Sequence, residues 1–77
     1  MSKAQQLFNL SFPNDAVKNI KSQAYLSGVL DTLNFKETGE SLHNRFNLGT
    51  AEADAWNAGN CEGHGLWRDY RDLETQS

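Results

Sequence analysis

Residues that can bind transition metals or act as nucleophiles lie close together near the C-terminal end of the chain. Cys61 and His64 are separated by two residues, Glu62 lies between them, and His43 lies further upstream. A structural zinc site needs four ligands in a tetrahedral arrangement, and its usual signature is two closely spaced ligand pairs. One pair is present here, so the sequence favours a half-buried cysteine and a surface or interface histidine. A metal bridging two chains, which would supply the missing ligands, is the alternative.

The same cysteine and histidine could also form a nucleophilic pair, because a neighbouring imidazolium favours the reactive thiolate. The sequence offers no obvious residue to orient the histidine and no oxyanion loop, and a chain of 77 residues has little room for a pocket that excludes water. The glycine-rich run GNCEGHG is not a phosphate-binding loop, because no Gly-Lys-Ser/Thr follows it. We therefore expect no enzymatic activity, no catalytic residues and no cofactor.

Length and composition predict one small folded domain over residues 1–77. The hydrophobic fraction is 38%, with two Trp, two Tyr and four Phe, which is more than a disordered, highly charged segment would have. A domain of this size buries only about 60% of the surface that its unfolded chain exposes. We therefore expect a marginal fold that is stabilised by a partner or by self-association, including a homodimer.

The cysteine content and the hydropathy pattern predict a cytoplasmic protein. A single cysteine cannot form an internal disulfide, which fits a reducing compartment. The N-terminus has no apolar run of signal-peptide length, and nowhere do about 18 apolar residues follow one another as a membrane span requires. We expect no membrane partner.

The charge distribution disfavours nonspecific binding to nucleic acid. The net charge is −3, and the chain after residue 38 holds three Arg against seven acidic residues. Proteins that bind nucleic acid usually present a stripe of Lys and Arg that neutralises phosphates. Such a stripe is missing here, which leaves only a short basic face that contacts one site as the alternative.

The clearest helical pattern lies in the N-terminal half. After Pro13, apolar side chains recur at intervals of three and four up to Leu33, as on the buried face of an amphipathic helix. Proline is tolerated in the first turn of a helix, where its missing N–H would be unpaired anyway. The pattern predicts a long helix over residues 13–35. The preceding residues, 1–11, form either a short helix or an apolar strap over the core.

Two more helices are predicted in the C-terminal half. The segment SLHNRFNLG has two apolar residues four apart, which favours a short helix over 40–48 with Gly49 as its left-handed cap. Thr50 is the expected N-cap of a long helix over 50–74, with acidic residues in its first turn. No stretch alternates with the period of two that a strand requires. The predicted fold class is all-α, a small helical hairpin or bundle of three to four helices.

The glycines at 59–65 raise the question of whether this last helix is continuous. Three glycines inside a helix would cost roughly 3 kcal/mol relative to alanines, which favours a loop or an irregular helix. The register favours a helix, because glycines between two indole rings on one face form a notch that lets another helix approach closely. The residues at this spacing are Trp56, Gly59, Gly63, Trp67, Tyr70 and Glu74.

The chain also contains a short internal match. AYLSGVLD, residues 24–31, aligns without gaps to AWNAGNCE, residues 55–62. In both copies an aromatic residue and a glycine lie three apart, so they are neighbours on a helix surface. Chance explains such a match about as well as a duplication does. Because the first copy lies in a predicted helix, the match favours a helix for the second copy.

The run WNAGNCEG followed by LWRDYRD resembles the glycine-notched helices of ribosome modulation factor and of small phage-encoded helical proteins built like it. The resemblance covers these two segments alone. The chain departs from that family in its acidic character and in the missing Cys/Asn-Pro-Tyr turn. No functional residue is carried over from it.

Together these features predict a small cytoplasmic, non-enzymatic protein that binds and regulates a larger protein, of the kind encoded by phages or mobile elements to inhibit or modulate a host factor. The predicted interface consists of Trp56, Gly59, Gly63, Trp67, Tyr70 and Arg71, unless the rings are needed to fill the core. The main alternative is a regulator associated with nucleic acid or the ribosome that uses Lys18, Lys21 and Arg45. A third hypothesis is a zinc-binding module that uses Cys61, His64 and His43.

Overall fold

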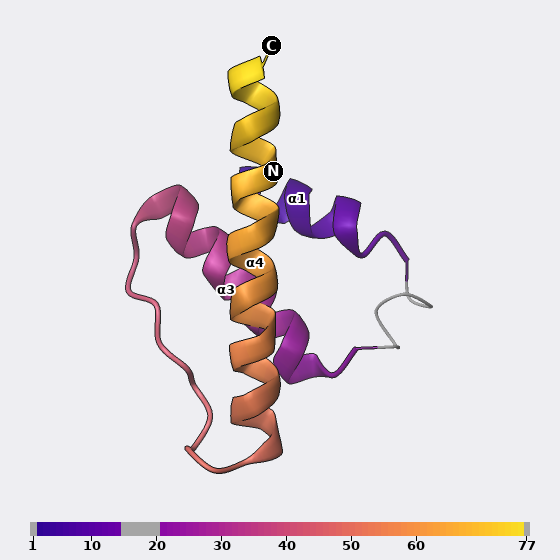
Figure 1. Cartoon of the computed structure of the whole chain (residues 1–77). Coiled ribbons are helices and arrows are strands. Elements are labelled where there is room, and N and C mark those ends of the chain that lie inside the picture. The colour runs from indigo at the N-terminus through magenta and orange to yellow at the C-terminus, as the bar shows by residue number, and fades with distance from the viewer. Residues whose placement is uncertain (1, 15–20, 77) are drawn as a thin grey trace.

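The computed structural model describes residues 2–14 and 21–76, and within these ranges it contains three helices and no strand. Helix α1 spans Lys3–Ser11, α3 spans Gln23–Thr38 and α4 spans Ala51–Gln76. Figure 1 shows α4 as a long rod that α3 crosses, with α1 beside α3 and the connecting segment 39–50 looping round the outside. The prediction of an all-α fold is confirmed.

Each of the three described helices follows a residue whose side-chain hydroxyl accepts a hydrogen bond from a backbone amide of the first turn. Ser2 accepts a hydrogen bond from the Gln5 amide at 3.1 Å, and Ser22 accepts one from Tyr25 at the same distance. Thr50 does the same for the amide of Ala53, also at 3.1 Å. Serine and threonine are favoured as N-caps because they satisfy amides that have no intrahelical acceptor. The predicted N-cap at the start of the last helix is therefore confirmed.

The predicted helix over 13–35 is wrong in its bounds. Pro13 and Asn14 are not helical, and α3 begins only after the Ser22 cap. Residues 15–20, which also belong to the prediction, lie outside the described part of the chain. At its other end, α3 continues to Thr38. Gly39 follows with a left-handed φ of 79°, and its amide donates a hydrogen bond to the carbonyl of Phe35. Caps rather than the apolar pattern therefore determined both ends.

The predicted short helix over 40–48 does not form. The segment instead uses its side chains to reach the helices: the Asn44 amide donates to the carbonyl of Ala53 at 2.9 Å, and Arg45 pairs with Asp31 at 2.7 Å. Such bonds compete with helix formation because they give the segment other partners. Gly49 has the predicted left-handed φ, 85°, but it lies in a turn rather than at a helix end.

Helix α4 is continuous, so the irregularity considered at 59–65 is absent from it. Residues 1–11 also resolve into a helix from Lys3, whose N-terminal amides are held by the Glu37 carboxylate at 2.8 Å and 3.3 Å. The core lies where the three helices meet. Its buried side chains are Ala4, Phe8, Phe12, Leu26, Val29 and Leu33, and Leu66 and Trp67 of α4 pack against them with one side.

Candidate functional site

The two segments of the internal match pack directly against each other where α3 and α4 cross. A Cβ atom on Gly59 would collide with the carbonyl of Tyr25 and would lie 3.0 Å from the amide nitrogen of Val29. A Cβ atom on Gly28 would collide in the same way with the carbonyl of Trp56, and it would lie 3.1 Å from the amide nitrogen of Asn60. The contact is therefore reciprocal, with each glycine set against the backbone of the other copy. The notch predicted from the sequence is real, and its occupant is a helix of the same chain.

Gly63 extends this notch by one turn. A Cβ atom there would lie 2.8 Å from the Cβ of Thr32 and 2.9 Å from the carbonyl oxygen of Val29. Thr32 is fully buried, and its hydroxyl donates to the side-chain oxygen of Asn60 at 2.6 Å. A buried hydroxyl needs such a partner, since an unpaired one would cost about 1–3 kcal/mol. The close approach of α3 and α4 thus also brings together a buried pair of polar side chains.

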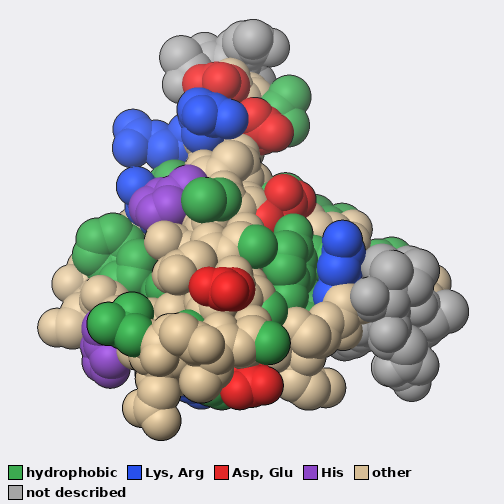
Figure 2. Space-filling model, turned by 60° about the horizontal axis from the view of Figure 1, so that its bottom comes forward, with side chains coloured by type: hydrophobic (Ala, Val, Ile, Leu, Met, Phe, Trp, Pro, Cys, Tyr) green, Lys and Arg blue, Asp and Glu red, His purple; other side chains and the backbone are tan. Residues whose placement is uncertain are grey.

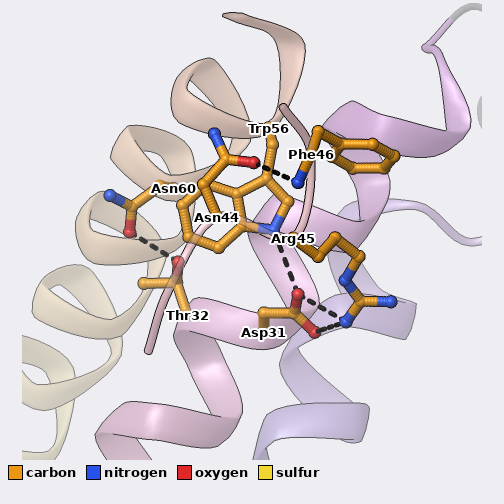
Figure 3. A network of polar contacts seen from close by, with 7 residues as sticks. All are labelled: Asp31, Thr32, Asn44, Arg45, Phe46, Trp56 and Asn60. Atoms are coloured by element: carbon orange, nitrogen blue, oxygen red, sulfur yellow. Dashed lines mark hydrogen bonds and ion pairs between the residues drawn. The ribbon is translucent and has the colours of Figure 1, made fainter. Parts of the chain in front are cut away.

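Trp56 belongs to a second polar network (Figure 3). Its ring is only 3% exposed, and its indole N–H donates to Asp31 at 3.0 Å. The guanidinium of Arg45 donates to both oxygens of the same carboxylate, at 2.8 Å and 2.7 Å. Asp31 therefore joins α3, α4 and the connecting segment through one side chain. Trp56 and Arg45, each predicted to contact a partner, are engaged within the chain.

The corresponding pair of residues in the match is Tyr25 and Glu62. Tyr25 aligns with Trp56, and Glu62 aligns with Asp31. Burial and then the negative charge of Glu62 raise the pKa of the Tyr25 hydroxyl.

The remaining predicted interface residues lie on the later turns of α4. The rings of Trp67 and Tyr70 are 5.5 Å apart and half-buried, and Arg71 is exposed. The Lys3 ammonium lies 5.1 Å from the centre of the Tyr70 ring, and interaction with Tyr70 raises the pKa of Lys3. The Tyr70 hydroxyl donates to Glu74 on the same helix. We call Trp67, Tyr70, Arg71 and the adjacent Leu73, which is 68% exposed, the α4 outer face.

A groove of about 500 Å³ borders this face. It lies between the end of α3 and the middle of α4, and we call it the basic groove; its lining consists of Lys36, His64, Trp67, Arg68, Arg71 and Asp72. On the side shown in Figure 2, basic side chains gather next to a histidine towards the C-terminal end of α4. Burial, and then the charge of Lys36, lower the pKa of His64.

The three residues considered for a metal do not form one cluster. Cys61 is exposed on α4, His64 lines the basic groove, and His43 lies in the connecting segment beside Phe35 and Arg45. No cluster of three possible metal ligands occurs among the residues that the structure describes. Within residues 2–14 and 21–76, the chain therefore offers no ready site for a structural zinc ion.

Two of the basic residues considered for nucleic acid, Lys21 and Arg45, contact other side chains of the chain. Lys18 lies outside the described residues. The Lys21 ammonium lies 5.0 Å from the centre of the Tyr25 ring, and Arg45 is paired with Asp31. The cations that do line one groove are Lys36, Arg68 and Arg71. Lys36 was missed because it comes from a different helix, and no spacing in the sequence links it to the other two.

Comparison with protein-family models, curated proteins and solved structures gave no significant match. Among the described helices, none combines the length and the apolar character needed to cross a membrane. Function is therefore inferred from the contacts and charges of this chain alone.

Proposed function

We propose that the chain is a small, non-enzymatic regulatory protein that binds a larger protein through the α4 outer face. The proposal rests on one observation: the structure buries three of the six predicted interface residues and leaves the other three at the surface. Trp56, Gly59 and Gly63 are buried against α3, whereas the other three remain at the surface on later turns. Figure 1 shows the last turns of α4 rising beyond α3.

The composition of this face supports protein binding. Tryptophan, tyrosine and arginine are the residue types most enriched among those that dominate binding energy at protein interfaces. Leu73 adds an exposed apolar side chain one turn after Tyr70. The polar side chains at the crossing, by contrast, bond to one another and hold the helices together. For this reason we assign the chain no catalytic step.

The small size and acidic balance support the further proposal of a cytoplasmic accessory protein of the phage or mobile-element kind that modulates a host factor. A homodimer formed through the same face would be a second mode of association. Sedimentation at two concentrations distinguishes it from binding to a different protein, because only self-association depends on the concentration of this chain alone.

The test is a pull-down from the native host that compares two matched substitutions of exposed leucines. Leu73→Glu places a charge on the α4 outer face, and Leu48→Glu places one on the connecting segment, where Leu48 is 91% exposed. We expect the wild type and Leu48→Glu to recover the same partner, and Leu73→Glu to lose it. Circular dichroism confirms that both variants fold. Equal recovery by all three proteins would show that the α4 outer face is not the interface.

The alternative function is a regulator that binds nucleic acid or the ribosome, and the cations of the basic groove favour it. Binding of this kind weakens steeply as salt rises, because the protein releases counterions from the phosphates. Salt-sensitive binding of RNA by the wild type, lost in Arg68→Glu but retained in Leu73→Glu, would support the alternative over the protein-binding function.

A further inference from the structure

The basic groove gathers positive charge from two helices. Lys36 lies in the last turn of α3, while Arg68 and Arg71 lie three apart on α4, and the imidazole of His64 lies one turn before Arg68. Asp72 contributes an acidic side chain at the edge of the same lining. The groove therefore concentrates cations in a chain whose net charge is −3.

Lys36 and Arg68 form no ion pair with a carboxylate among the residues that the structure describes. Asp72 follows Arg68 at a spacing that allows an ion pair on a helix, yet the two side chains do not form one. Lys36 also has no carboxylate within ion-pair distance in the described part of the chain, and its ammonium lies 5.9 Å from the Phe35 ring centre.

A short acidic segment fits this groove better than a long polyanion does. The volume of about 500 Å³ falls within the range of roughly 300–1,000 Å³ that is typical of pockets for small ligands. Asp69 and Glu74 are exposed nearby on the same helix and would face an extended phosphate backbone with like charge. A short acidic peptide has only a few carboxylates, and the cations of the basic groove are enough to pair with them.

The chemistry of the lining indicates how such a segment would bind. The guanidinium of Arg68 can hold a carboxylate through two parallel hydrogen bonds, and the Lys36 ammonium acts as a point charge. Trp67 places a half-buried indole ring beside these cations, where an apolar side chain of the segment could pack. The groove therefore combines recognition of an anion with an apolar contact.

We propose that the basic groove binds an acidic segment of the protein partner, with carboxylates on Lys36 and Arg68 and an apolar side chain against Trp67. This inference rests on the proposed protein-binding function, because it assigns the chemistry of the partner at the border of the α4 outer face. It makes the groove the specificity-determining part of the interface.

The test uses a fluorescein-labelled peptide of alternating Glu and Leu and the same peptide with Gln in place of Glu. Fluorescence anisotropy measures both against the full chain. We expect the acidic peptide to bind and the Gln peptide not to bind. Arg68→Glu and Lys36→Glu each weaken binding at least about tenfold, because each replaces an attractive charge by a repulsive one. Binding also weakens as NaCl rises from about 50 mM to about 300 mM.

The matched control is Lys21→Glu, which makes the same charge change before the start of α3, at the other end of that helix from the groove. We expect it to bind the acidic peptide as the wild type does. Equal weakening in Lys21→Glu and Lys36→Glu would overturn the proposal, because it would show an effect of net charge alone. Equal binding of the Glu and Gln peptides, or of neither, would overturn it too.

Two further measurements separate other occupants from the proposed one. Tighter binding of a single-stranded oligouridine than of the acidic peptide would assign the groove to nucleic acid and overturn the proposal. Self-association that Arg68→Glu abolishes would assign it to a second copy of the chain, with the same consequence. In the pull-down, a partner lost with Leu73→Glu but retained with Arg68→Glu would contradict this inference and leave the protein-binding function intact.

Discussion

Trp56 and Trp67 are the same type of residue on one face of one helix, and their surroundings differ. Trp56 is 3% exposed and donates its indole N–H to Asp31, next to the point where the glycines bring α3 and α4 together. Trp67 is half-buried, packs against the core with one side and lines the basic groove with another. The first half of α4 is thus buried against α3, and the second half keeps aromatic and polar side chains at the surface.

The position of the helix crossing explains this difference. Helix α3 ends at Thr38, so it covers α4 along the turns that hold Gly59 and Gly63 but not along the last ones. Changes in the first half of α4 should therefore alter stability, and changes in the second half should alter binding. The predictions below test this division.

The largest effect is expected for Gly59→Leu. Its side chain would have to occupy space filled by the backbone of Tyr25 and Val29, which cannot move aside as a flexible side chain can. Overpacking of a core typically costs about 1–3 kcal/mol and more where backbone must shift, while a domain this small has only about 5 kcal/mol of stability. We expect no cooperative thermal unfolding transition by circular dichroism.

Gly65→Ala is the matched control for this substitution. A Cβ atom there would meet its nearest atom, in the Arg68 side chain, only at 3.8 Å. Alanine is favoured over glycine inside a helix by roughly 0.5–1 kcal/mol, so the melting temperature should rise. If Gly59→Leu melted as the wild type does, the close crossing would be disproved.

The next largest effect separates the two tryptophans. Trp56→Ala should lower the free energy of unfolding by about 3–5 kcal/mol, because it removes a buried ring and leaves Asp31 with one partner fewer. Trp67→Ala should cost roughly half as much, since part of its ring is exposed. Urea titration measures both, and the pull-down should show the reverse order for any variant that still folds. Equal losses of stability would remove the distinction between the two halves.

A smaller effect is expected for the hydrogen bond between Thr32 and Asn60. Thr32→Val keeps the shape of the side chain and removes its donor, so it should cost about 1 kcal/mol. A double-mutant cycle with Asn60→Ala isolates the pair from other effects of each change. Coupling near zero would mean that this bond does not contribute to the crossing.

The smallest effect concerns His64 in the second half of α4. Its pKa is lowered in the folded state, so the folded protein binds the proton less readily than the unfolded chain, whose ordinary value is 6.5. The resulting stabilisation is present above that pH and is lost as the pH falls through the lowered pKa. Urea titrations between about pH 7.5 and about pH 5 should show a modest loss of stability that is absent in His64→Gln. The same slope in both proteins would exclude His64 as its source.

Local signals in the sequence were sufficient for much of the fold. The helix from residue 51 follows from the Thr50 cap and from the register that continues through the glycines, and the internal match identified the notch. These features depend on hydrogen bonds and side-chain spacing within a few residues, so they can be read without knowing the neighbours. The same local signals failed at 40–48, where Asn44 and Arg45 bond to distant helices instead of forming a turn of their own.

The sequence by itself determined that the chain is helical, where α4 begins, and that Gly59 and Gly63 lie on one face with both indole rings. Only the tertiary structure decided that Gly28 meets Gly59 across the crossing, that Trp56 is buried and Trp67 is not, and that Lys36 lies beside the arginines of α4. The physical reason is the range of the interactions. Helix propensity, capping and register act over neighbouring residues, whereas burial and the grouping of charges depend on which backbone from another part of the chain covers each face.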